Sequence, residues 1–155
     1  MGKYIKYGIV ILIIVIVATG IFLGIYFVSQ VSAVYPPIKE YNFTLSVNDF
    51  EKKIIEIAEK EPNLNYFKQD TVGNLENGFA YYMEIVIKDK NTEIDYLVKY
   101  SDSKYSTDNQ QHLELKLIHA FDKLNNIGGY HIEDAGVKKL LETFYKEIVL
   151  KIERK

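Results

Sequence analysis

The strongest constraint on this chain is an unbroken apolar run near its N-terminus, from Gly8 to Val28. The run has 21 residues and no charged side chain, and only tyrosine is ionisable between Lys6 and Lys39. At about 1.5 Å per residue, a helix of this length spans about 31 Å, which matches the roughly 30 Å hydrocarbon core of a bilayer. A lone strand in lipid would leave its backbone N–H and C=O groups unpaired, whereas a helix pairs them internally. The run therefore predicts one transmembrane helix over residues 8–28.

The charges on either side of this run indicate its orientation. Lys3 and Lys6 precede it with no acidic residue, and the first charges after it are Lys39 and Glu40. Positive charge near a membrane span stays on the cytoplasmic side. We therefore expect a single-pass protein of the cell membrane with residues 1–7 in the cytoplasm and the C-terminal domain outside.

A cleaved signal peptide is the alternative interpretation of the same segment. Val31-Ser32-Ala33 has the small residues that signal peptidase requires, and cleavage after Ala33 would release a secreted form. The apolar run is, however, longer than the usual 7–15 residues, and this favours a retained anchor. Residues 29–40 contain Pro36-Pro37 and are expected to form a stem linker to one domain over residues 41–155.

Composition excludes several classes of function. Without Lys3 and Lys6, 17 of the 19 basic residues remain against 21 acidic ones, a net charge of −4. This charge argues against nucleic acid or anionic lipid as a partner, since either would call for a basic face. There is no cysteine, which excludes disulfides, thiol catalysis and cysteine-based zinc sites.

The first half of the domain predicts a short strand, a helix and three strands. Residues 41–45 alternate apolar and polar, and Ser46 is a good N-cap for a helix that Pro62 ends. Residues 64–72, 79–87 and 93–100 show strand patterns, and an antiparallel meander with 79–87 in the middle is the simplest arrangement. The following residues of the middle strand are expected to face inward: Phe79, Tyr81, Met83, Ile85 and Ile87.

The second half predicts two helices. Ser106 would cap the first, whose apolar stripe is Leu113, Leu117, Phe121 and Leu124, and the second covers about 134–154. The expected fold is α+β: an N-terminal transmembrane helix, then a small antiparallel sheet of about three strands packed by about three helices.

No residue pattern predicts catalysis, a cofactor or a metal. His112 and His119 would lie about 10.5 Å apart along one helix, too far to share an ion, and His131 lies in a glycine-rich loop. Residues 89–95 resemble the start of a calcium loop but lack its sixth-position glycine, and residues 73–78 lack the Lys-Ser/Thr of a P-loop. Ser101-Asp102-Ser103-Lys104 has the Ser-x-x-Lys spacing without its companion motifs. We therefore expect a protein that is not an enzyme.

Two features suggest contacts with other molecules. Gly20 and Gly24 would let two membrane helices approach closely, so they are a possible dimer contact. Tyr82, Tyr96 and Tyr100 belong to the predicted sheet and are a possible binding face, although core packing explains them as well.

The sequence thus predicts a single-pass membrane protein that presents a small non-catalytic domain outside the cytoplasm. Its expected partners are the membrane and another protein in an envelope complex, or a second copy in a homodimer. The alternative is an extracytoplasmic domain that binds a saccharide or a lipid on a tyrosine-rich sheet face.

Overall fold

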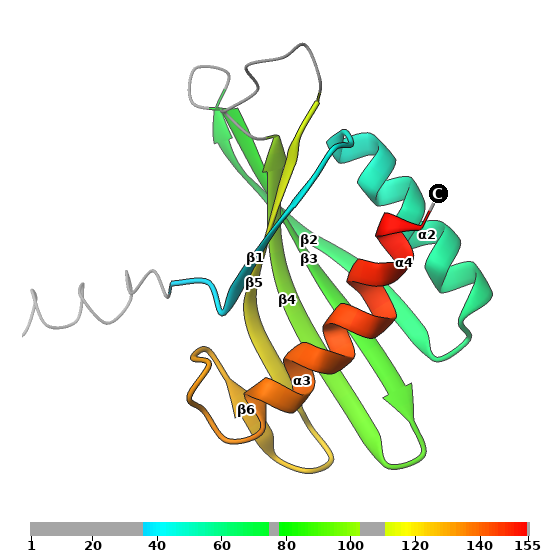
Figure 1. The fold of residues 1–155 in the computed structure, drawn as a ribbon, viewed down its shortest axis with the longest axis vertical. Coiled ribbons are helices and arrows are strands. Elements are labelled where there is room, and N and C mark those ends of the chain that lie inside the picture. Colours follow the sequence, from blue (N-terminus) through cyan, green and yellow to red (C-terminus); the bar gives the residue numbers. More distant parts are fainter. Residues whose placement is uncertain (1–35, 75–77, 103–110, 155) are drawn as a thin grey trace, which may run out of the picture. The chain divides into compact units, whose positions relative to one another are not determined.

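The computed structural model of the chain describes residues 36–74, 78–102 and 111–154 (Figure 1). The predicted anchor at 8–28, with Gly20 and Gly24, lies outside these residues, as does the cytoplasmic segment 1–7. Within the described ranges, no helix is long and apolar enough to cross a membrane. The chain from Tyr35 to Lys155 forms one compact unit.

A single antiparallel sheet of six strands dominates this unit. Five strands lie side by side in the order β1-β5-β4-β3-β2. The sixth, β6, pairs with the second half of β5. The strands are β1 (Lys39–Phe43), β2 (Leu64–Asn74), β3 (Gly78–Asp89), β4 (Thr92–Asp102), β5 (Leu113–Asp122) and β6 (Ile127–Gly129).

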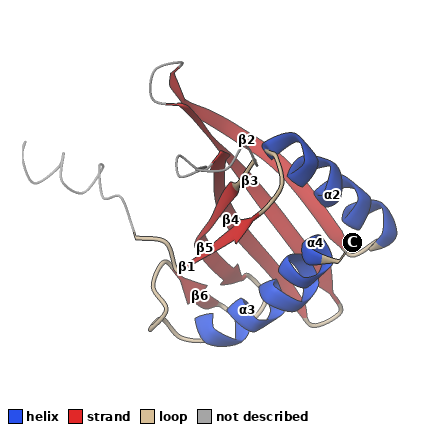
Figure 2. Cartoon of the chain, turned by 45° about the horizontal axis from the view of Figure 1, so that its top comes forward, coloured by secondary structure: helices blue, strands red, loops and turns tan. Residues whose placement is uncertain are grey.

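Two helices cover one face of the sheet (Figure 2). The first is α2 (Val47–Lys60). The second runs without a break through α3 (Val137–Phe144), one π-helical turn η1 (Tyr145–Val149) and α4 (Leu150–Glu153). Both helices bury their apolar faces against the sheet, and Phe50, Ile54, Phe144 and Ile148 are fully buried there.

The α2 helix begins and ends where local chemistry predicts. The Ser46 hydroxyl accepts a hydrogen bond from the Asp49 amide at 3.0 Å, which satisfies one of the free N–H groups of the first turn. Asp49 also places a negative charge near the positive end of the helix dipole. The prediction of a helix capped by Ser46 is confirmed.

The predicted sheet of about three strands with about three helices is wrong, because the described residues form six strands and two helices. The main error is residues 113–122, which form strand β5 and not a helix. Apolar residues four apart, such as Leu113 and Leu117, fit a helix and also fit a strand, since four is an even number. The intervening Leu115 is also fully buried, and only the two-residue period of a strand explains that.

An irregularity within β5 also obscured its period. Leu97 pairs with His119 and Val98 pairs with Leu117, so Ile118 is an extra residue in β5. Beyond this bulge the strand changes phase: Leu117 faces the core before it, and Ala120 and Asp122 face the core after it. Phe121, which the helical pattern assigned to the core, therefore lies on the opposite face.

The strand meander of residues 64–102 is confirmed, because β3 pairs with both β2 and β4. On β3, Met83, Ile85 and Ile87 are buried as predicted, while Phe79 is 40% exposed. The short strand predicted at 41–45 is present as β1.

The C-terminal helix starts later than predicted, at Val137. Gly136 precedes it with a φ of 81°, a conformation that favours glycine, and the Asp134 side chain accepts a hydrogen bond from the His131 amide in the preceding loop. The π-helical turn adds Val149 to the buried face beside Ile148. The sequence period did not predict this turn.

Candidate functional site

The three tyrosines proposed as a binding face do not lie together. Tyr96 and Tyr100 are fully buried and face the helices, whereas Tyr82 points to the other side of the sheet. The reason is the two-residue period of β4, whose even-numbered residues from Ile94 to Tyr100 all face the core. Tyr96 and Tyr100 are therefore core residues, and a shared binding face with Tyr82 is excluded.

Both buried tyrosines use their hydroxyl groups inside the protein. The Tyr96 hydroxyl donates to the Leu140 carbonyl at 2.8 Å, and the Tyr100 hydroxyl donates to Glu51 Oε1 at 2.9 Å. Burial raises the pKa of both hydroxyls above its usual range, and the Glu51 carboxylate contributes at Tyr100. These contacts join α2 and α3 to the middle of the sheet.

The face of the sheet away from the two helices has no described helix packed on it, and we call it the open face (Figure 2). Strand register assigns its residues, because each pairs with a neighbour on the same side. The central residues of the open face are Phe67, Tyr82, Glu84, Val86, Asp95, Leu97, Lys99, Lys116, His119 and Phe121.

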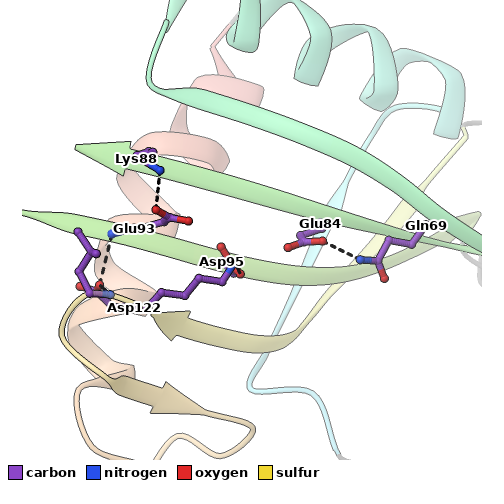
Figure 3. Close-up of polar contacts among 8 residues, drawn as sticks. Gln69, Glu84, Lys88, Glu93, Asp95 and Asp122 are labelled. Atoms are coloured by element: carbon purple, nitrogen blue, oxygen red, sulfur yellow. Dashed lines mark hydrogen bonds and ion pairs between the residues drawn. The ribbon is translucent and has the colours of Figure 1, made fainter. Parts of the chain in front are cut away.

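Most charges on the open face are paired across neighbouring strands (Figure 3). Lys88 lies 2.7 Å from Glu93, and Gln69 donates to Glu84 at 2.7 Å. The hydrogen bond from Lys88 lowers the pKa of Glu93. The Lys88–Glu93 ion pair neutralises the surface locally, whereas the neutral amide of Gln69 satisfies a Glu84 oxygen and leaves its charge in place.

His119 is the centre of an aromatic cluster on this face, together with Phe121 and Tyr130. Its ring centroid lies 4.3 Å from that of Tyr130 and 6.0 Å from that of Phe121. Burial lowers the pKa of His119, and the negative charge of nearby Asp95 only partly opposes this. We call these three residues, with Leu97 and Val86 beside them, the His119 cluster.

Asp95 borders the His119 cluster and pairs with Lys123. Its other carboxylate oxygen, Oδ1, is buried, and among the described residues it is the one buried side-chain oxygen or nitrogen without a hydrogen-bond partner. Buried polar atoms nearly always have partners, so such an oxygen calls for a reason. Because this oxygen has almost no accessible surface, a molecule docked on the open face would not reach it directly, and the structure shows no reason for the missing partner.

Asp122 has a structural role at the end of β5. It is almost fully buried, and its carboxylate accepts hydrogen bonds from Asn125 Nδ2 at 2.7 Å and from the amides of Leu124, Glu93 and Asn125. Burial alone would raise the pKa of Asp122, but these donors outweigh it and lower the pKa. The residue closes the turn to β6 and is not available to a ligand.

An apolar groove of about 300 Å³ lies between β1 and the C-terminal helix. Its lining combines Tyr41, Leu141 and Tyr145 with three charged residues, Lys39, Glu142 and Lys146. The π-helical turn begins at Tyr145, beside the groove. Turns of this type occur frequently at functional sites.

The remaining candidate motifs have structural explanations. The calcium-like motif forms the tight β3–β4 hairpin, whose strands end at Asp89 and begin at Thr92. His119 lies on a strand and His112 just before it, so the two do not share a helix, and His131 lies in the β6–α3 loop. Ser103 and Lys104 fall outside the described residues. Within the described ranges no three His, Asp or Glu side chains are placed to hold a metal ion.

Comparison of the chain with protein-family models, with curated proteins and with solved structures found no match. Among the described residues, the candidate sites are therefore the open face and the groove, and each is assessed by its own geometry. The sequence did not predict the His119 cluster, because it depends on the phase change in β5. It did not predict the groove, because that depends on how the last helix packs beside β1.

Proposed function

We propose that this chain is a membrane-anchored protein whose domain lies outside the cytoplasm and binds another protein through the open face. The uncharged run 8–28 and the preceding Lys3 and Lys6 support the anchor and its orientation. The observation that carries the binding role is the His119 cluster, an apolar patch on a sheet face that no described helix covers.

The composition of this patch resembles the core of a protein interface. Phe121, Tyr130 and Leu97 supply aromatic and aliphatic area, and charged side chains around them are already paired. Interface cores are rich in aromatic residues and poor in unpaired charge.

Site-specific photocrosslinking in intact cells tests the proposal. A photoreactive residue at Leu97, on the open face, should give one crosslinked product with a mass unlike that of two copies of this chain. The same residue at Lys139, which is exposed on the opposite, helical side, is the control.

A second step links the product to the His119 cluster. With the photoreactive residue at Tyr82, also on the open face, the added substitution Leu97→Arg should abolish the product because it places a charge in the apolar patch. Folding of the variant is checked by its thermal transition. Equal products from Leu97 and Lys139, or a Tyr82 product that survives Leu97→Arg, would contradict the proposal.

The groove beside β1 favours a second candidate function, the binding of an anionic amphiphile. Tyr41, Leu141 and Tyr145 in its lining suit an acyl chain, and Lys39 and Lys146 outnumber Glu142 and suit an anionic head group. The full chain should bind a fluorescent fatty acid in detergent-free nanodiscs, and Leu141→Arg should remove this binding. Val72→Arg, an exposed site on β2, is the control.

A further inference from the structure

The long edge of the sheet at β2 has no neighbouring strand among the described residues. The opposite edge differs in length, because it is formed by two short strands, β1 and β6, and not by one long strand. An open strand edge offers unpaired N–H and C=O groups to any other extended chain. Phe67 and Val72 on β2 are also 56% and 52% exposed, the most exposed large apolar side chains of the described strands.

The register of β2 shows which backbone groups are free. The Lys88 amide donates to the Asn63 carbonyl at 2.8 Å, so in this antiparallel pair Asn65 and Phe67 point their backbone groups toward β3. Leu64, Tyr66 and Lys68 consequently point theirs outward. The Leu64 amide is already used, since it donates to the Glu61 carbonyl at 2.9 Å.

This free set complements itself. Tyr66 offers one donor and one acceptor, Leu64 offers an acceptor, and Lys68 offers a donor. We propose that two copies of this chain associate through antiparallel pairing of their β2 strands, with Tyr66 opposite Tyr66 on the two-fold axis. Each Tyr66 amide then donates to the partner's Tyr66 carbonyl, and each Lys68 amide donates to the partner's Leu64 carbonyl. The interface is isologous and closes after two copies.

The side chains around the edge agree with this pairing. A groove of about 290 Å³ runs between α2 and β2, and Ile55, Ala58 and Tyr66 line it. In the paired arrangement the partner's Tyr66 lies next to this groove, because residues opposite each other point to the same side of a sheet. Ile55, now 39% exposed, would lose solvent contact.

Charge also matches across the proposed axis. Glu59 lines the end of the groove near Leu64, and the partner's Lys68 lies opposite Leu64. Lys68 is already 2.6 Å from Glu51 of its own copy, so it would stand between two carboxylates. The electrostatic energy of the Lys68 ammonium is therefore more favourable in the dimer than in the single chain.

The irregular part of β2 defines where the pairing stops. The register of β2 against β3 shifts between Lys68 and Asp70, with Gln69 as the extra residue. A bulge and a charge are common means of preventing open-ended strand addition. The regular stretch from Leu64 to Lys68 is thus the part that can take a partner strand.

Disulfide trapping between two differently tagged full-length copies tests the register. Asn65 of one copy lies opposite Phe67 of the other, in a non-hydrogen-bonded pair whose Cα atoms are about 4.5 Å apart. That distance permits a disulfide, whereas the two Asn65 residues lie diagonally across the axis and are too far apart. The native chain has no cysteine to interfere.

Mild oxidation of membranes carrying Asn65→Cys and Phe67→Cys copies should therefore give a heterodimer severalfold above either variant alone. Asn65→Cys mixed with Val72→Cys is the matched control, since Val72 has the same face, strand and exposure but lies beyond the bulge. Equal yields from the two mixtures, or none from the first, overturn the proposal.

A charge substitution distinguishes this interface from association through the membrane segment. Phe67→Lys should disperse the dimer of the full chain in detergent, measured by light scattering, while Val72→Lys should leave it intact. If both variants stay dimeric, the anchor or another surface holds the copies together and the β2 interface is rejected. The proposed β2 dimer depends on the fold and not on the proposed function. A failed search for a protein partner of the open face would therefore not contradict it.

Discussion

At the scale of single residues, Asp122 combines burial with the largest set of hydrogen bonds of any described side chain. Its substitution by alanine leaves the amides of Glu93, Leu124 and Asn125 without their acceptor. We expect Asp122→Ala to lower the free energy of unfolding by about 2–4 kcal/mol. Urea denaturation measures this loss, and Glu56→Ala, at an exposed site on α2, should change stability by less than about 0.5 kcal/mol.

The same carboxylate predicts an acid dependence. The pKa of Asp122 is lower in the folded state, so its contribution is complete above the unfolded pKa of about 3.9 and is lost as pH falls through the folded value. Between pH 5 and pH 3 the wild type should therefore lose more stability than Asp122→Asn. A parallel decline of the two proteins would contradict this assignment.

His119 predicts a second dependence, at higher pH. Its pKa is lowered in the folded protein, so the unfolded chain binds a proton first when pH falls below about 6.5. Stability from the neutral ring is complete above that pH and declines below it. Urea melts at pH 7.5 and 5.5 should show this decline in the wild type, and His119→Gln should show less of it. If His119→Gln loses as much stability as the wild type between pH 7.5 and pH 5.5, other groups cause the decline.

At the scale of elements, β3 shows how one strand serves two faces. Ile85 is fully buried under the helices, and Tyr82 is half-buried on the open face. We expect Ile85→Ala to cost about 2–5 kcal/mol because it leaves a cavity in the core. Tyr82→Ala should cost distinctly less. Urea denaturation compares the two, and equal losses would mean that the open face is covered in solution.

Strand β5 shows how an element can be assigned to the wrong class. Leu113, Leu117 and Phe121 are four residues apart, which suits both a helix and a strand. The alternation of Leu113, Leu115 and Leu117 with Glu114 and Lys116 indicates a strand, but it lasts only five residues before the bulge at Ile118 interrupts it. The pairing of β5 with β1 and β4 then stabilises the strand form.

At the scale of the whole molecule, the central prediction is topology. We expect the residues after Pro37 to face outside, because Lys3 and Lys6 favour a cytoplasmic N-terminus. Protease added to intact cells or spheroplasts should remove the domain, and substitution of both lysines by glutamate should increase the protected fraction. Protection of the native domain until lysis would reverse the orientation. An intact mass that begins at Val34 would instead demonstrate cleavage after Ala33.

Several features of this protein are determined by sequence alone, and all of them depend on neighbouring residues. The cap at Ser46, the β3–β4 hairpin and the inward side of Ile85 follow from local hydrogen bonding and from a regular period. These features could be predicted because the residues that determine each of them are close together in the sequence.

Tertiary structure alone decided the rest, including the candidate site. Whether β5 is a strand depends on its partners far along the chain, and the bulge at Ile118 decides that His119 and Phe121 share the open face. The burial of Tyr96 and Tyr100 likewise depends on which side of the sheet the two helices cover. A period of two places alternate residues on opposite faces, but only packing between distant segments determines which face meets water.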